Sequence, residues 1–316
     1  MEPTVDTPIL KPAIDEMKDF NAFILSINDL AENHGAIKII PPQEWRNKTA
    51  NFNSLNIIPI FQDVNLLNDE IYIQSHERFK STTSVKAFWD LSDNENNRLN
   101  MDQRETMFWE EITKKRNIYA PDIEASLFDV KQKIFNMNLL NDLVSRERDE
   151  NKNTINGVNT PFLYFGSFGT SFAFHVEDYN LYSMSYLHWG APKSWYVVPP
   201  RDGKKMEKLA REYLSSYQCK DAIKHKIFLP SPRSLVANDI RFGRIRQEEG
   251  EFVVTFPYGY HGGFNNGNNI AEAINFGTRY WYENLEFGYK ASKNICQCKQ
   301  FDLKFGFDET TLRNLI

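Results

Sequence analysis

The sequence is poor in cysteine, with only Cys219, Cys296 and Cys298 in 316 residues. An odd count, without a basic and apolar signal segment at the start, argues against a disulfide framework and favours a reducing compartment. No window approaches the roughly 18 uncharged apolar residues of a membrane-spanning helix, so no membrane association is expected. Basic residues are also in deficit, because 37 Lys and Arg against 42 Asp and Glu give a formal net charge of −5. Direct sequence-specific binding of nucleic acid is therefore not expected.

The rest of the composition is typical of a folded globular protein, with 41% hydrophobic and 25% charged residues. At about 150 residues per domain, the length suggests two domains or one large domain with an appendage. Aromatic residues make up 14% of the chain, which indicates a thick core or aromatic-walled pockets.

The first half of the chain has a mixed pattern. Apolar residues at three- and four-residue steps within 12–35 predict a helix that ends at Gly35, and 36–40 reads as a short strand. Residues 48–128 predict a mixture of helices and polar loops. Further helices are predicted over 85–91, 102–115 and 130–144.

From residue 160 the pattern changes to short strands. Aromatic and β-branched runs predict strands over 162–165, 171–177, 181–187, 194–198 and 252–256. One helix is predicted among them, over 202–216. Together the two halves indicate an α+β protein whose strands form a sandwich, jelly roll or small barrel.

The tripeptide His175-Val176-Glu177 lies in one of these strands. Residues i and i+2 of a strand point to the same face, so one metal ion could take both side chains. His261, in the glycine-rich segment 256–264, is the best candidate for a third ligand. Two histidines and a carboxylate form the facial triad of non-haem Fe(II) oxygenases. The tripeptide alone is weak evidence, because a histidine near a solvated glutamate occurs by chance in many chains.

The surrounding sequence is more specific. Residues 160–166, 171–178 and 186–196 resemble the JmjC domain of histone lysine demethylases, and 256–264 resembles the segment that carries its distal histidine. Residues 8–45 resemble the JmjN module. The pairing of JmjN with JmjC resembles the subfamily that demethylates trimethyl- and dimethyl-lysine in histone H3.

This resemblance implies a JmjC double-stranded β-helix of the jelly-roll, cupin-like kind, with surrounding helices. It also implies four regions along the chain. They are a JmjN helix-strand module at 6–47, a mixed helical and loop region packed on the core at 48–128, a JmjC catalytic domain at 129–293 and a C-terminal zinc-bound segment at 294–316.

The implied activity is that of an Fe(II)- and 2-oxoglutarate-dependent dioxygenase. It would use O₂ to hydroxylate methyl groups on lysine 9, lysine 36 or both of histone H3, with release of formaldehyde. The methylated histone H3 tail and chromatin are the implied partners, and the nucleus is the implied location. A catalytically weak or silent chromatin-binding JmjC module and a JmjC protein hydroxylase are the alternatives.

Several site residues are implied by position. Lys193 and Tyr119 match the pair that binds the distal carboxylate of 2-oxoglutarate, and Phe172 and Trp195 match aromatic walls of that pocket. The implied cosubstrate site also includes Asn265 and Ser185, and Ser185 stands where the family usually has Asn.

The implied methyl-lysine pocket is polar, with Gly157, Tyr164, Glu177 and Asn275 at matching positions. Ala273 and Ile274 stand where other members carry Ser and Thr. The balance between dimethyl and trimethyl substrates is therefore an open question.

A second metal site involves all three cysteines. Cys219, His225, Cys296 and Cys298 make a Cys₃His set, the pattern of a closed structural zinc site. The spacing alone also fits three unrelated thiols, but the resemblance implies zinc. The remaining histidines His34, His76 and His188 are interpreted as structural or surface residues.

Overall fold

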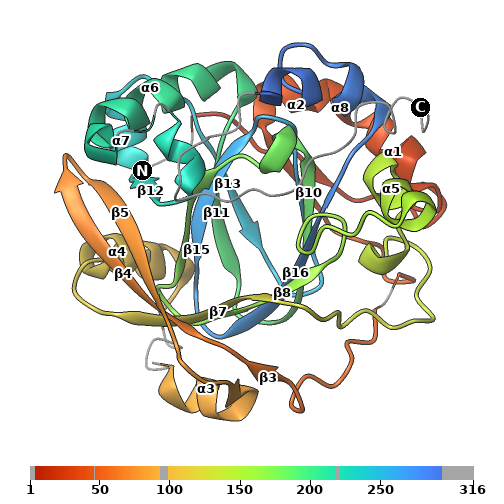
Figure 1. Cartoon of the computed structure of the whole chain (residues 1–316), viewed down its shortest axis with the longest axis horizontal. Helices are drawn as coiled ribbons and strands as arrows, with labels where there is room; N and C mark the ends of the chain where they lie inside the picture. Colours follow the sequence, from red (N-terminus) through yellow and green to blue (C-terminus); the bar gives the residue numbers. More distant parts are fainter. Residues whose placement is uncertain (1–3, 46, 93–98, 218, 220, 294–316) are drawn as a thin grey trace.

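The computed structural model describes residues 4–45, 47–92, 99–217, 219 and 221–293. Two sheets form an α+β core consistent with the predicted cupin-like fold (Figure 1). The major sheet contains, in spatial order, β1 (Ile9–Leu10), β2 (Ala36–Ile39), β14 (Phe252–Thr255), β10 (Tyr182–Gly190), β16 (Asn269–Phe276), β8 (Phe162–Gly166), β7 (Asn117–Ile123), β4 (Ile60–Asn68), β5 (Ile71–Arg78) and β12 (Phe228–Pro230). The minor sheet contains β13 (Gly243–Gln247), β11 (Lys193–Val198), β15 (Tyr260–Asn265) and β9 (Ser171–His175). A separate short ladder pairs β3 (Asn56–Ile57) with β6 (Thr83–Ser84).

Helices lie around the outside of the strands in Figure 1. They are α1 (Phe20–Ser26), α2 (Ala31–His34), α3 (Val85–Leu91), α4 (Met101–Glu111), α5 (Leu143–Asn151), α6 (Gly203–Tyr213), α7 (Pro232–Ala237) and α8 (Arg279–Glu283). Asp19, Ser84 and Asn100 each accept a backbone N–H in the first turn of α1, α3 and α4, which sets where those helices begin. Among the described residues, no helix is long and apolar enough to cross a membrane.

The N-terminal module packs on the major sheet. Its predicted helix is confirmed in part, because residues 12–19 form turns and bends before α1, and a 3₁₀ turn separates α1 from α2. Gly35 ends α2 in the left-handed conformation, at φ +71°, as the sequence predicts. β2 then pairs with β14, and Phe20 packs edge-to-face on Phe276 of β16 at 4.9 Å. The module therefore adds to the core of the sheet that follows it in sequence.

The region at 48–128 departs from its prediction. Its two helices are present as α3 and α4, but β4, β5 and β7 were not predicted, and all three join the major sheet. The inward positions of β4 include Gln62, which is almost fully buried between Ile60 and Val64. A buried glutamine breaks the apolar alternation by which strands are recognised. The limits of this region and of the other three remain predictions.

The predicted helix at 130–144 is wrong. The structure has turns, a 3₁₀ helix at Met137–Leu139, and then α5 beginning at Leu143. Asp129, Gln132 and Asn136 each accept a backbone N–H two residues further on, at 2.9–3.0 Å. Such side-chain bonds compete with helical ones, so the apolar spacing did not produce a helix here.

The strands and the helix predicted after residue 160 are confirmed as β8, β9, β10, β11, β14 and α6. Strands β13, β15 and β16 were missed, although β15 and β16 carry predicted site residues. The register places Ser185 of β10 opposite Ala273 of β16, and Ser183 opposite Asn275. These pairs bring the predicted substrate residues of β16 next to β10.

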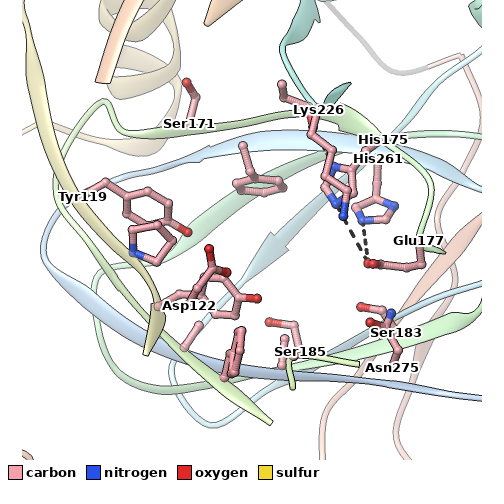
Figure 2. Close-up of a pocket in the computed structure, with 18 of the residues that line it drawn as sticks. Tyr119, Asp122, Ser171, His175, Glu177, Ser183, Ser185, Lys226, His261 and Asn275 are labelled. Carbon is pink, nitrogen blue, oxygen red and sulfur yellow. Dashed lines mark hydrogen bonds and ion pairs between the residues drawn. The ribbon is translucent and has the colours of Figure 1, made fainter. Parts of the chain in front are cut away.

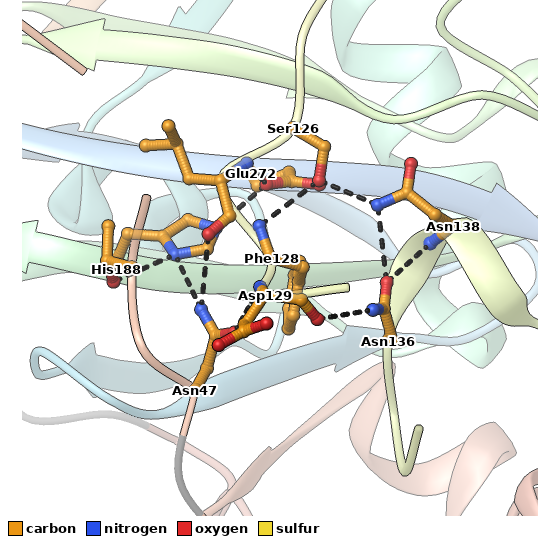
Figure 3. A network of polar contacts seen from close by, with 10 residues as sticks. Asn47, Ser126, Phe128, Asp129, Asn136, Asn138, His188 and Glu272 are labelled. Atoms are coloured by element: carbon orange, nitrogen blue, oxygen red, sulfur yellow. Dashed lines mark hydrogen bonds and ion pairs between the residues drawn. The ribbon is translucent and has the colours of Figure 1, made fainter. Parts of the chain in front are cut away.

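A buried polar network connects Asn47 and the segment 126–138 to strands β10 and β16 (Figure 3). The Glu272 carboxylate accepts hydrogen bonds from Leu127 N–H and from His188 Nε2, both at 2.8 Å. Asn47 Nδ2 lies 3.3 Å from His188 Nδ1, and Asn47 Oδ1 accepts from Asp129 N–H at 2.9 Å. The structural interpretation of His188 is thus confirmed.

Candidate active site

Three polar side chains meet at one end of the minor sheet (Figure 2). His175 is the last residue of β9, Glu177 follows in extended backbone, and His261 lies opposite His175 on β15. Glu177 Oε1 is 3.3 Å from His261 Nε2 and 3.9 Å from His175 Nε2. One ligand atom from each residue lies within 4.8 Å of the other two. The structure therefore brings the three predicted ligands together.

The backbone holds both imidazoles with the same nitrogen toward the centre. His175 Nδ1 lies 2.7 Å from the carbonyl of Ala173, and His261 Nδ1 lies 3.0 Å from that of Gly259. With Nδ1–H donated to a carbonyl, each Nε2 lone pair faces Glu177 and is available to a metal.

Burial and the neighbouring His261 lower the pKa of His175 to about 3. Burial on its own would raise the pKa of Glu177, but its hydrogen bond with His261 and the neighbouring His175 and Lys226 hold that pKa well below its usual range. A neutral imidazole and an ionised carboxylate are the forms that ligate a divalent cation. The donor set therefore fits Fe(II), which takes two histidines and one carboxylate in facial sites.

The three ligands open into a cavity of about 460 Å³. Its wall holds nearly all the predicted cosubstrate and substrate residues: Tyr119, Gly157, Tyr164, Phe172, Ser185, Lys193, Trp195, Ala273, Ile274 and Asn275. Asn265 is the exception, because it lies behind Lys193 and not on the wall. One cavity thus collects residues that are spread over more than 150 positions of the sequence.

Lys193 is a buried cation on this wall. Its Nζ donates to the neutral Asn265 Oδ1 at 2.9 Å and lies 4.8 Å from the Phe172 ring centre. Burial lowers the pKa of Lys193 to about 7. Trp195 packs edge-to-face on Phe172 at 4.8 Å and donates its indole N–H to Gln247. A buried ammonium held by a neutral amide suits an anionic ligand.

Comparison with known proteins finds two domain families and several lysine-specific demethylases that this chain is similar to. The JmjC domain family, described as a hydroxylase, matches residues 162–276, and the jmjN domain family matches residues 8–41. The chain is 39% identical over 315 residues to lysine-specific demethylase 4D of Rattus norvegicus. It is 38% identical over 306 residues to probable lysine-specific demethylase 4F of Homo sapiens and 38% identical over 319 residues to lysine-specific demethylase 4B of Mus musculus.

The chain thus contains a jmjN domain followed by a JmjC domain. The three alignments cover 97%, 94% and 97% of this chain, but 61%, 47% and 28% of the relatives' own lengths. The similarity thus extends beyond the two domains and includes the region at 48–128 between them.

The JmjC cavity also contains charged residues that the sequence analysis missed. Lys226, just after the 3₁₀ helix η7 (Ala222–His225), and Asp122, near the end of β7, both line it. Burial lowers the pKa of Lys226, but the carboxylates of Asp178, Glu177 and Asp122 together raise it above its usual value. Burial raises the pKa of Asp122, which is hydrogen-bonded to Tyr164. Both Lys226 and Asp122 have positive φ, near +55° and +58°, for which their sequence gives no signal.

A polar row on β4 and β5 completes the wall. Gln62, Gln74 and His76 line the cavity, and Gln62 bonds the backbone of Ser171 on β9 at 2.7 and 2.8 Å. His76, interpreted from sequence as an ordinary polar position, lies 3.3 Å from Gln62 Nε2. These residues are invisible to motif analysis because their strands were not predicted.

The end of the JmjC cavity that the sequence analysis assigns to methyl-lysine is formed mainly by the major sheet. Asn275 donates to the carbonyl of Tyr182 at 3.1 Å, and Ser183 and Ser185 lie beside it on β10 (Figure 2). Burial raises the pKa of Tyr164 well above its usual value, so its hydroxyl keeps its proton. Gly157 has φ +75°, and a Cβ there would come within 2.5 Å of the Phe162 ring, which explains the glycine.

Two of the four predicted zinc ligands are described. His225 is buried in η7 and Cys219 is half-buried, and both lie in the segment between α6 and β12. Cys296 and Cys298 lie outside the described residues.

Proposed function

We propose that this chain is an Fe(II)- and 2-oxoglutarate-dependent dioxygenase that removes methyl groups from trimethyl- or dimethyl-lysine of histone H3. The observation that carries the proposal is the shared cavity, where two histidines and a carboxylate converge near a buried lysine, Lys193, whose ammonium donates to a neutral amide. Lysine-specific demethylases 4D and 4B, which it resembles, are named for this class of reaction.

His175, Glu177 and His261 would hold the iron through two Nε2 atoms and a carboxylate oxygen. When bound, Fe(II) supplies the redox chemistry that uses O₂ and 2-oxoglutarate to oxidise an inert methyl group. Overall, each methyl group leaves as formaldehyde, and 2-oxoglutarate becomes succinate and CO₂. The residues of the chain bind and orient the two organic reactants and keep water away from them.

Lys193 binds the distal carboxylate of 2-oxoglutarate as an ammonium, and the Tyr119 hydroxyl donates a second hydrogen bond to it. Burial raises the pKa of Tyr119, so this hydroxyl remains a donor at neutral pH. Phe172 and Trp195 cover the aliphatic part of the cosubstrate and exclude water from the Lys193 contact. Asn265 supports Lys193 from behind. Ser185, shorter than the family's asparagine, completes this side of the cavity.

The methylammonium group is bound by oxygen atoms, not by an aromatic cage. The Gly157 carbonyl, the Tyr164 hydroxyl, the Asn275 side chain and the Glu177 carboxylate surround that part of the cavity. Ala273 and Ile274 offer no hydroxyl at positions where some family members carry Ser and Thr and others carry Ala and Ile, so this end is more apolar. A cation with methyl groups is attracted by the nearby acids and fits an oxygen-lined, partly apolar wall.

A zinc ion bound by Cys219, His225, Cys296 and Cys298 is part of the proposal. The support is the Cys₃His donor set and the burial of His225, whose pKa is lowered by that burial. A neutral imidazole and three thiolates make a closed tetrahedral site. Zinc would join the C-terminal segment to the edge of the JmjC domain. The methylated histone H3 tail, chromatin and the nucleus complete the proposed context.

The test is mass spectrometry of histone H3 peptides trimethylated at lysine 9 or lysine 36, incubated with Fe(II), 2-oxoglutarate and ascorbate. Stepwise losses of 14 Da, the mass of one CH₂ unit per methyl group removed, are expected for wild type and are absent in His175→Ala. A gain of 16 Da on another protein, without demethylation, would indicate a protein hydroxylase instead. Failure to bind 2-oxoglutarate at all would favour the silent module and direct attention to Ser185.

A further inference from the structure

The contact behind Lys193 links the two sheets of the fold. Lys193 of β11 is paired in register with Asn265 of β15, and its Nζ donates to Asn265 Oδ1 at 2.9 Å. Asn269, the first residue of β16 in the major sheet, donates from Nδ2 to the same oxygen at 3.0 Å. This inference rests on the proposed function, because it concerns how the 2-oxoglutarate carboxylate is bound.

The amide of Asn265 has one orientation that satisfies its neighbours. Its Oδ1 accepts from both Lys193 and Asn269, and its Nδ2 donates to Thr170 Oγ1 at 2.9 Å. The reversed amide would turn an NH₂ group toward two other donors in a buried site, which is costly. Asn269 and Thr170 thus decide which end of Asn265 meets the lysine.

Asn269 is itself held rigidly. It is fully buried, and its Nδ2 also donates to the Ala191 carbonyl at 3.0 Å. Its register partner on β8 is Gly166, where an added Cβ would lie 2.5 Å from Asn265 Cγ and from Asn269 Oδ1. The glycine leaves just enough room for the two asparagines to meet.

We propose that Asn269 is a positioning residue for 2-oxoglutarate, which acts through Asn265 to aim the Lys193 ammonium into the cavity. The neutral amide occupies one N–H of the ammonium and leaves its charge for the ligand. A carboxylate at position 265 would neutralise that charge instead. The geometry therefore separates two tasks, since Lys193 binds the carboxylate and the asparagine pair sets where it binds.

The test compares two ligands. 2-Oxopentanoate has the chain of 2-oxoglutarate with a methyl group in place of the distal carboxylate, so it cannot use Lys193. Binding is measured by titration calorimetry on the full chain with Mn(II) in place of Fe(II). Asn269→Ala is expected to weaken the binding of 2-oxoglutarate about tenfold, about the contribution of one hydrogen bond, and to change the binding of 2-oxopentanoate less than twofold.

Asn268→Ala is the matched control, because Asn268 directly precedes Asn269 but its Oδ1 accepts a hydrogen bond from Ser92 at 3.0 Å. It is expected to bind both ligands as wild type does. Equal weakening of both ligands in Asn269→Ala would mean a merely structural role, and unchanged 2-oxoglutarate binding would also overturn the inference. If wild type itself binds no 2-oxoglutarate, the proposed function falls together with it.

Asn265→Asp keeps the size of the side chain and covers the case in which Asn269→Ala fails to fold, as judged by thermal unfolding. Its carboxylate would pair with the Lys193 ammonium. We therefore expect the variant to bind 2-oxoglutarate at least tenfold more weakly and to bind 2-oxopentanoate with little change in affinity. Wild-type affinity for 2-oxoglutarate in this variant would contradict the inference, because the neutral amide would then be dispensable.

Discussion

The affinity for 2-oxoglutarate is expected to fall as the pH rises through neutrality, because of Lys193. Burial lowers its pKa from 10.5 to about 7, so the free protein is a mixture of ammonium and neutral amine near pH 7. Only the ammonium attracts the distal carboxylate. Binding at higher pH must therefore take up a proton, and the free-energy cost of that uptake weakens the complex.

The magnitude follows from this value. If only the ammonium binds, the apparent Kd scales with the ratio of total to protonated Lys193, which rises about tenfold between pH 6 and pH 8 for a pKa of about 7. Proton uptake on binding rises over the same range, from about 0.1 to about 0.9 per ligand. The proposed metal ligand His175 does not disturb this range, because burial lowers its pKa to about 3 and it stays neutral throughout.

The pH dependence that Lys193 gives to the stability of the ligand-free protein has the opposite sign to that of the affinity for 2-oxoglutarate. A base whose pKa is lower in the folded than in the unfolded protein costs stability as the pH falls from the unfolded value to the folded one. The ligand-free protein is thus expected to lose stability from about pH 10.5 down to about pH 7, with no further loss from Lys193 below that. Bound 2-oxoglutarate should restore part of this stability.

Calorimetry at pH 6, 7 and 8, with Mn(II) and in two buffers of different ionisation enthalpy, measures both Kd and proton uptake. 2-Oxopentanoate serves as the control ligand and Lys193→Met as the control variant, and neither should show a rise in Kd between pH 6 and pH 8. The same Kd for 2-oxoglutarate at pH 6 and pH 8, or an equal rise for 2-oxopentanoate, would refute the assignment of this dependence to Lys193.

Three further predictions concern metal binding and stability. Glu177→Ala removes the one anionic ligand, so Mn(II) affinity by calorimetry should drop more than tenfold; near-normal affinity would exclude Glu177 as a ligand. Glu272→Ala leaves the N–H groups of Leu127 and His188 buried without their acceptor, and urea unfolding should register a loss of about 3–5 kcal/mol. Glu272→Gln keeps one acceptor oxygen, so its free energy of unfolding should fall clearly less than that of Glu272→Ala. Equal losses of stability in the two variants would contradict this account. Gly35→Ala should lower the free energy of unfolding by about 2 kcal/mol, because a φ of +71° is strained for alanine and the Cβ would lie 2.8 Å from Val198 O. An unchanged urea midpoint would argue against that strain.

Two of the three proposed metal ligands could be predicted from the sequence because they follow a local rule. His175 and Glu177 are two residues apart in extended chain, and that spacing alone puts both on one face. His261 had to be chosen among the other five histidines; its glycine-rich segment and then the family resemblance favoured it, and the register with His175 now explains the choice.

Lys226 and Asp122 could not be predicted in this way. Each side chain enters the cavity from a single left-handed residue, at a strand end or beside a 3₁₀ turn, and no periodicity marks such a position. Gln62 was missed for a different reason, because its burial depends on hydrogen bonds to Ser171 of another sheet. Such positions become recognisable only when tertiary partners are known.

The two sheets divide the proposed work between them. The minor sheet and its extension carry the proposed metal ligands and Lys193, whereas Ser185 of β10 and the residues around Ala273 of β16 belong to the major sheet. In the proposed function, a change at Ala273 or Ile274 would therefore alter the fit of the methylated lysine without moving His175 or His261. Asn269 is one point where the major sheet reaches the Lys193 side of the cavity. The proposed methyl-lysine contacts thus lie mainly on the major sheet, the proposed metal ligands lie on the minor sheet and its extension, and the proposed cosubstrate contacts come from both sheets.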